Sequence, residues 1–321
     1  MTTVTIHGQQ VGRIKASFLL AAESFRFLKA DPEMLLLPII GFFLNIALWI
    51  PALLAIFFGA AGGTFAGLGT LFPKGEPMPQ WAYIVVFYGF FTSAFTIAFV
   101  QAGISHFVSS RARGVNETLG GTLRVVLSLL SVLIVWSLIA ATVGFVLRQI
   151  AERSKIVTRI IVAIIGVAWS VLTYFVIPAI VIERQSAVAS IKRSGKVFRD
   201  SWGETIVSNI SLSGFFMLIF LMLIALYAVL TVLFFTYLGS SIGLFIAMTV
   251  IFLFTLFMIS LVSNTLTYVL KTLLFIYATE GTTASNFDAD LLANMLVKKP
   301  GAVQPPMPPV PPVPPASQGM M

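Results

Sequence analysis

Residues 205–270 form an unbroken run of 66 residues that contains no Asp, Glu, Lys or Arg. A bilayer-spanning helix needs about 20 apolar residues, so this run is too long for one span and fits two. The whole chain follows the same trend, with 58% hydrophobic and only 10% charged residues. A soluble domain carries about 25% charged residues, because polar side chains must cover its surface. These features exclude a water-soluble globular enzyme.

Uncharged runs divide the chain into six predicted membrane-spanning helices. The runs show no residue-by-residue alternation and are too long for barrel strands. The only turn-like patch inside 205–270 is residues 237–243, which separates the last two spans. We therefore predict an all-α, polytopic helical membrane protein with six transmembrane helices in a domain over 34–278. The spans lie near residues 34–61, 82–106, 125–147, 160–182, 205–236 and 244–270.

The Lys and Arg residues predict how these spans are oriented. With the N-terminus inside, 15 of the 20 positive residues fall on the cytoplasmic side. The loop between the third and fourth spans is the exception, because it places four positive residues outside. The first apolar run starts only at Met34, so we expect no cleavable signal peptide. We predict a multi-pass protein of the cytoplasmic (inner) membrane with both termini in the cytoplasm.

Two amphipathic segments flank spans on the predicted cytoplasmic side. In the segment over 1–33, apolar residues recur every three or four positions over 11–29, which predicts a surface helix. A basic helix over 186–202 repeats this plan, and a shorter, weaker one covers 112–124. Such helices either only anchor the spans or form a surface for lipid or a partner. The candidate lipid-contact residues of the basic helix are Lys192, Arg193, Lys196, Arg199 and Trp202.

Few residues could carry chemistry. The chain has no Cys and only two His, so we expect no metal site, no cofactor and no catalytic centre. His106 is the one candidate base, and no acidic residue lies near it in the sequence. No Asp or Glu lies inside a span, which argues against an ion-coupled carrier of the acidic type. The candidate intramembrane polar positions, which either bond helices together or line a cavity, are Asn45, Gln101, His106 and Asn264.

The C-terminal part differs in composition from the spans. Residues 279–299 are predicted to be a cytoplasmic segment, and residues 300–321 hold nine of the 16 prolines. Such a tail cannot form a helix or a core, so we expect it to be disordered or extended. It is either featureless or a ligand for a protein partner with an aromatic Pro-binding groove. The net charge of +8 is assigned to membrane orientation, and no nucleic-acid partner is expected.

Several short motifs resemble a known family. They are Ala141-Thr142-Val143-Gly144, Gly166 with Ala168-Trp169, Pro178 with Val181 and Glu183, Lys192-Arg193-Ser194, Ser201-Trp202-Gly203-Glu204 and Tyr277-Ala278-Thr279. The chain looks like a family of uncharacterised bacterial integral membrane proteins, a domain of unknown function, over residues 12–299. The resemblance implies a multi-span inner-membrane protein and brings no catalytic residues. A weaker likeness is to the membrane domain beside some glycerophosphodiester phosphodiesterases, whose acidic catalytic domain is absent here.

Three functions remain open at this point. The first, which we favour, is a non-enzymatic structural or accessory protein that organises lipid or a partner complex. The alternative is a channel or transporter for a small solute or lipid, with a cavity at Asn45, Gln101 or Asn264. The third is a membrane-embedded enzyme built around His106. The sequence fixes neither the substrate nor the partner nor the oligomeric state.

Overall fold

The structure, a computed structural model, is helical apart from one short hairpin. It describes residues 3–6, 9–12, 25, 28–29, 31–60, 79–152, 156–201, 206–238 and 241–281. The elements are β1 (Thr3–Ile6), β2 (Gln9–Gly12), η1 (Pro32–Leu35), α2 (Leu36–Leu54), η2 (Ala55–Ala60), α4 (Gln80–Ala112), α5 (Leu119–Ser128), α6 (Leu130–Glu152), α7 (Ile156–Leu172), α8 (Val176–Glu183), α9 (Ala187–Ser201), α10 (Ile206–Leu233), η3 (Phe234–Leu238) and α11 (Ile242–Glu280).

Among the described residues, six helical segments are long and apolar enough to cross a membrane, as the sequence predicts. They cover Pro32–Phe58, Gln80–Ala112, Leu130–Glu152, Ile156–Glu183, Phe216–Tyr237 and Ile242–Glu280. Helix α4 lies at the centre, because α2, α5, α6, α8 and α11 all pack against it. Helix α10 packs against α11, and α11 joins this pair to the rest of the molecule.

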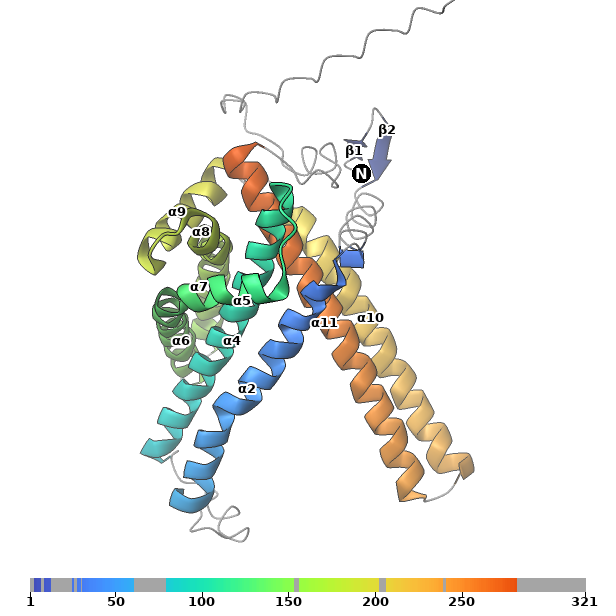
Figure 1. The fold of residues 1–321 in the computed structure, drawn as a ribbon. Helices are drawn as coiled ribbons and strands as arrows, with labels where there is room; N and C mark the ends of the chain where they lie inside the picture. The colour runs from blue at the N-terminus through green and yellow to red at the C-terminus, as the bar shows by residue number, and fades with distance from the viewer. Residues whose placement is uncertain are drawn as a thin grey trace, which may run out of the picture.

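The helices meet at one end of the molecule and separate at the other (Figure 1). We call the first the compact end: η1, α5, α8, α9 and the last turns of α4 and α11. We call the second the splayed end, where α2 and α4 form one arm and the α10–η3–α11 hairpin forms the other. The arms touch where the rings of Phe42 and Phe257 lie 4.7 Å apart between centroids.

The compact end holds the best-buried large side chains. Phe107 of α4, Phe275 of α11 and Phe175, between α7 and α8, are at most 1% exposed and belong to one apolar cluster. In the splayed part of α11, by contrast, Phe254 is 61% exposed. The two ends of one helix therefore lie in different surroundings.

The fourth span, predicted as one helix over 160–182, is broken into two helices. Helix α7 ends at Leu172, a turn follows, and α8 begins at Val176. Pro178 lies in the first turn of α8, where its missing N–H costs little, whereas a continuous helix would place its ring against the carbonyl of Tyr174. The proline thus explains why the span is two helices.

The prediction of an amphipathic helix over 112–124 is corrected at both ends. Helix α5 starts at Leu119, where the side chain of Thr118 accepts a hydrogen bond from the N–H of Gly121. The third spanning helix then begins at Leu130 instead of near 125, because the chain turns at Leu129. Gly120 and Gly121 lie in the first turn of α5.

The helix predicted over 11–29 is wrong at its start. Val11 belongs to β2 and pairs with Val4 of β1 in an antiparallel hairpin. All four residues of Thr3–Ile6 are β-branched, which favours a strand and is not visible in helical spacing. Phe25, Leu28 and Lys29 are helical, and the other residues of the predicted helix after Gly12 lie outside the described part.

Candidate functional site at the compact end

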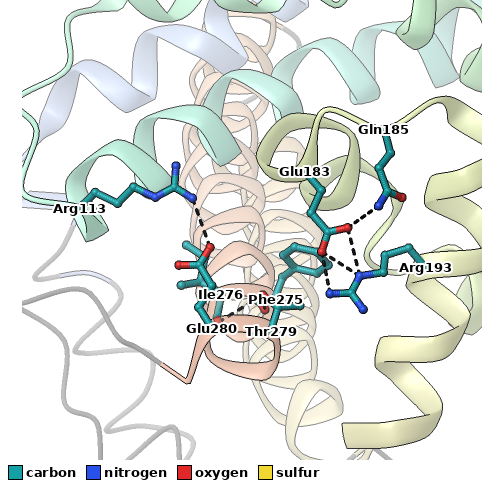
Figure 2. Close-up of polar contacts among 8 residues, drawn as sticks. All are labelled: Arg113, Glu183, Gln185, Arg193, Phe275, Ile276, Thr279 and Glu280. Atoms are coloured by element: carbon teal, nitrogen blue, oxygen red, sulfur yellow. Dashed lines mark hydrogen bonds and ion pairs between the residues drawn. The ribbon is translucent and has the colours of Figure 1, made fainter. Parts of the chain in front are cut away.

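An ion pair closes the turn between α8 and α9. Glu183 is the last residue of α8, and its carboxylate oxygens accept hydrogen bonds from Nε of Arg193 at 2.8 and 3.0 Å. A terminal nitrogen of the same guanidinium lies 2.7 Å from Oε1. Nε2 of Gln185 donates to the other oxygen at 2.8 Å, as Figure 2 shows. The turn depends on Arg184, a non-glycine residue in the left-handed region with φ of 53°.

Helix α9 also holds the break between α7 and α8. The N–H of Phe175 donates to Oγ of the fully buried Ser194 at 2.9 Å. Phe175 is the N-cap residue of α8. The hydroxyl of Ser194 therefore satisfies one of the N–H groups that a helix start leaves unpaired. The small serine lets α9 approach closely, and the bond fixes α9 against the membrane-spanning helices.

Two further ion pairs tie the end of α4 to other helices. Arg113, which follows α4, donates to Oε1 of Glu280, the last residue of α11, at 3.2 Å. Arg111 pairs with Asp31, which precedes η1. Figure 2 shows the Arg113–Glu280 and Glu183–Arg193 pairs on either side of the last turns of α11. The pairs of Arg111 and Arg113 connect the end of α4 to the start of the first span and to the last turn of α11, respectively.

His106 has an acidic partner that sequence reasoning missed. Nε2 of His106 lies 3.3 Å from Oε2 of Glu117, which is eleven residues away in the loop before α5. The other carboxylate oxygen accepts a hydrogen bond from the N–H of Thr118 at 3.2 Å. A side chain at Gly121 would displace this carboxylate from its present position. The pair links α4 to the start of α5, and the presence of Gly121 is the signal that could have revealed it.

Polar contacts between α4 and α11 continue into the core. The hydroxyls of Ser105 and Thr272 lie 2.9 Å apart, and both residues are fully buried. Thr272 also donates to the carbonyl of Tyr268 within α11. A hydroxyl pair in an apolar core satisfies both groups and fixes the register of the two helices.

The predicted intramembrane positions are not brought together by any contact among the described residues. Nδ2 of Asn45 donates to Oγ1 of Thr96 at 3.2 Å, which joins α2 to α4. Asn264 donates to Ser260 one turn away in α11. Gln101 is buried in α4, and its Nε2 has no hydrogen-bond partner in the described part of the chain. Asn45 thus bonds to a second helix, whereas the bond of Asn264 stays within α11.

The basic helix predicted over 186–202 is present as α9. The face that packs against the other helices, however, lies beside the predicted apolar stripe and not on it. The most buried positions are Ala187, Ser190, Ser194 and Val197, whereas Val188 of the predicted apolar stripe is 54% exposed. Of the candidate lipid-contact residues, Lys192, Lys196 and Arg199 are exposed, and Arg193 is partly buried by its pairing with Glu183. Trp202 lies outside the described residues. The exposed face of α9 is therefore basic.

The compact end is built for fixed geometry. Of the five acid–base pairs among the described residues, four lie here and join different parts of the chain; the fifth, Arg148–Glu152, lies within α6. No group of three or more His, Asp or Glu in the described ranges could hold a metal ion. What the arrangement provides is a rigid surface with a basic helix on it.

Comparison with known proteins agrees with the motifs that suggested an uncharacterised family. Residues 81–285, well over half of the chain, match the Family of unknown function (DUF6159). The match covers α4 to α11 and leaves α2 out, so it is shorter than the range of 12–299 expected from the sequence. No curated protein and no solved structure matches the chain. The chain belongs to the DUF6159 family, a family of unknown function.

Proposed function

We propose that the chain is a non-enzymatic structural or accessory protein of the cytoplasmic membrane. In this proposal the compact end faces the cytoplasm and presents a fixed surface to a protein partner. The main support for this proposal is that polar contacts between different parts of the chain are concentrated at this end. They are four acid–base pairs and the Ser105–Thr272 hydroxyl pair. The hydroxyl pair is buried, and a satisfied buried polar contact specifies one arrangement of the helices that it joins. Together these contacts would keep the exposed basic face of α9 in one position relative to the membrane.

The distribution of positive charge supports the orientation. Arg111, Arg113 and the basic residues of α9 lie at the compact end, whereas Arg148 and Arg159 lie at the other ends of α6 and α7. A topology with the compact end inside places most Lys and Arg in the cytoplasm.

Single cysteines can test this orientation, because the chain contains none of its own. In intact cells, a membrane-impermeant maleimide is expected to label Glu152→Cys and to leave Lys196→Cys unlabelled until the cells are opened. Both positions are exposed. Labelling of Lys196→Cys in intact cells would contradict the proposed orientation.

Partner capture tests the accessory role. We expect the full chain to retain a protein partner through mild detergent extraction, and the Pro-rich residues 300–321 are the first candidate contact. Three versions are compared: the full chain, a chain that ends at 299, and a Lys192→Glu, Lys196→Glu double variant. Loss of the partner in one variant assigns the contact to the tail or to α9. If no partner is recovered and deletion changes no membrane property, the accessory role is wrong.

One observation favours the alternative, a channel or transporter. The side-chain amide nitrogen of Gln101 is buried in the central helix and has no hydrogen-bond partner in the described part of the chain. An unsatisfied donor inside a span is costly and often marks a polar pathway. If solute flux is found in vesicles, Gln101→Leu should abolish it while Asn264→Leu should not. The accessory role is preferred because Asn45 already bonds to Thr96.

A further inference from the structure

Lys271 stands out among the cations of the compact end. It lies on α11 and is partly buried, with Nζ 4.5 Å from the ring centroid of Tyr174 and 6.0 Å from that of Tyr268. Tyr174 comes from the break between α7 and α8, and Tyr268 lies one turn earlier on α11. The ammonium therefore lies against two aromatic rings contributed by two different helical segments.

The described residues provide Lys271 with no acidic partner. The carboxylates of Asp31, Glu117, Glu183 and Glu280 at this end are paired with Arg111, His106, Arg193 and Arg113 respectively. Aromatic faces attract a cation, but they accept few of the three hydrogen bonds that an ammonium donates. A partly buried charge in this state is stabilised by an additional anion.

The length of α11 places Lys271 at the level of the lipid headgroups. The helix has 39 residues and is about 58 Å long, against a hydrocarbon core of about 30 Å. Its splayed end is apolar from Ile242 onward, so the excess length extends from the membrane at the compact end. A span of 17–25 residues from Ile242 ends between about 258 and 266, and Lys271 follows about one and a half to three and a half turns later. Tyrosine is also enriched at this depth.

The surroundings of Lys271 are positive. Helix α9 packs against α11 and α8, and it carries the exposed Lys192, Lys196 and Arg199. A basic surface beside a bilayer raises the local concentration of anionic lipid. Four carboxylates at this end are already paired, so their charge is offset, and Glu33 of η1 is exposed to solvent.

We propose that Lys271, oriented by Tyr174 and Tyr268, binds the phosphate of an anionic phospholipid in the leaflet at the compact end. The lipid lies beside α11 with its acyl chains along the apolar helices, and its phosphate accepts hydrogen bonds from the ammonium. The exposed lysines of α9 attract lipid of this class, and Lys271 holds one molecule. Lipid binding at this site does not require a protein partner, so the test below can fail without contradicting the accessory role, and the reverse also holds.

The test counts bound lipid on the purified full-length protein. Native mass spectrometry is performed in detergent with added phosphatidylglycerol or, in parallel, phosphatidylcholine. The wild type is expected to retain one tightly bound phosphatidylglycerol, and Lys271→Gln to bind it about fivefold more weakly. The matched control is Lys196→Gln, which removes an exposed lysine of α9 and should retain the tightly bound lipid. Lys271→Arg keeps the charge and should also retain it.

Further measurements keep the proposal falsifiable if Lys271→Gln folds poorly. Tyr174→Leu leaves the lysine in place and removes the nearer ring, and it should also weaken phosphatidylglycerol binding. Equal binding by the wild type, Lys271→Gln and Tyr174→Leu would overturn the proposal. Equal retention of phosphatidylcholine would overturn the preference for an anionic lipid. Displacement of the lipid by inorganic phosphate would show a site for free phosphate instead of lipid, which would also overturn it.

Discussion

The two ends of α11 belong to one helix and have different neighbours. At the compact end, Thr272 and Phe275 are fully buried and Glu280 pairs with Arg113. At the splayed end, Ile251 is 67% exposed and Phe254 61% exposed. Both ends are rich in apolar residues, so apolarity alone does not decide which part packs against other helices.

The difference follows from the solvent at each end. Inside a bilayer, lipid chains are as apolar as leucine, so apolar helices gain little by leaving lipid for one another. In the proposed orientation the last turns of α11 extend beyond the hydrocarbon, where water restores the hydrophobic effect and burial of Phe275 stabilises the fold. In the described part of the chain, hydrogen bonds at the splayed end join α2 to α4, or α10 to α11, and none joins the two arms. Separation of the arms is the expected result.

The largest expected effect is all-or-none and concerns the arms themselves. A Phe42→Cys, Phe257→Cys pair should be joined by a short bifunctional thiol reagent, because the two rings are in contact. A Leu53→Cys, Ile246→Cys pair lies eleven residues further along both antiparallel helices, and both positions are exposed. This second pair should not be joined. Mass spectrometry of the proteolysed protein detects the link, and its formation in the second pair would show that the arms close.

Overpacking should affect the two arms unequally. A side chain at Gly41 of α2 would collide with Val100 of α4, whereas nothing lies within 4 Å of a Cβ at Gly243 of α11. Gly41→Leu should lower the free energy of unfolding by about 3 kcal/mol, and Gly243→Leu should not lower it. Thermal unfolding in detergent measures both, and equal shifts would contradict a close contact at Gly41.

Loss of a carboxylate should matter more where it joins two helices. Glu183→Gln leaves Arg193 partly buried without its counter-charge, and we expect a loss of about 2 kcal/mol. In Glu152→Gln the partner Arg148 is half exposed within the same helix, and the change should be below about 0.5 kcal/mol. Chemical unfolding in mixed micelles measures both variants. A larger loss of unfolding free energy in Glu152→Gln than in Glu183→Gln would contradict the view that ion pairs between helices stabilise the compact end.

The smallest expected difference compares two threonines in matching roles. Thr272 and Thr249 both donate to the carbonyl four residues earlier, and both meet a hydroxyl on another helix. Thr272→Val leaves the buried Ser105 without this partner and should cost about 1 kcal/mol. Thr249→Val faces the partly exposed Tyr227 and should cost about 0.6 kcal/mol or less. The ranking is tested by thermal unfolding in the same detergent, and a reversed ranking would count against the comparison.

Hydropathy predicted the six spans because each requirement is local: about 20 apolar residues without charge. It also predicted that a basic helix follows the fourth span, since the spacing of apolar and basic residues is contained in α9 itself. The break in the fourth span could not be predicted from hydropathy, because Pro178 is compatible with either a kink or the start of a new helix. The β1–β2 hairpin was missed because its strands have only four residues each.

The site itself was less predictable, because it depends on turns. Glu183 and Arg193 are ten residues apart, and they meet only because Arg184 adopts a left-handed conformation. The carboxylate of Glu117 reaches His106 only because the chain reverses before α5 and Gly121 leaves room. On α9, Ser190 and Ser194 are buried although they are polar, so a search for apolar spacing selected the neighbouring stripe. Charge and hydropathy give no information about such backbone reversals.

Helix α11 connects the two leaflets mechanically. It contains no proline from Ile242 to Glu280, so it has no built-in hinge and acts as one rod. Its contact with α2 at Phe257 is a fulcrum, with an outer arm of about 22 Å and an inner arm of about 34 Å. A change in bilayer thickness or lateral tension that tilts the outer arm therefore acts directly on the packed inner arm, because no hinge in the helix absorbs the motion. That inner arm carries Lys271 and ends at Glu280, where Arg113 holds it.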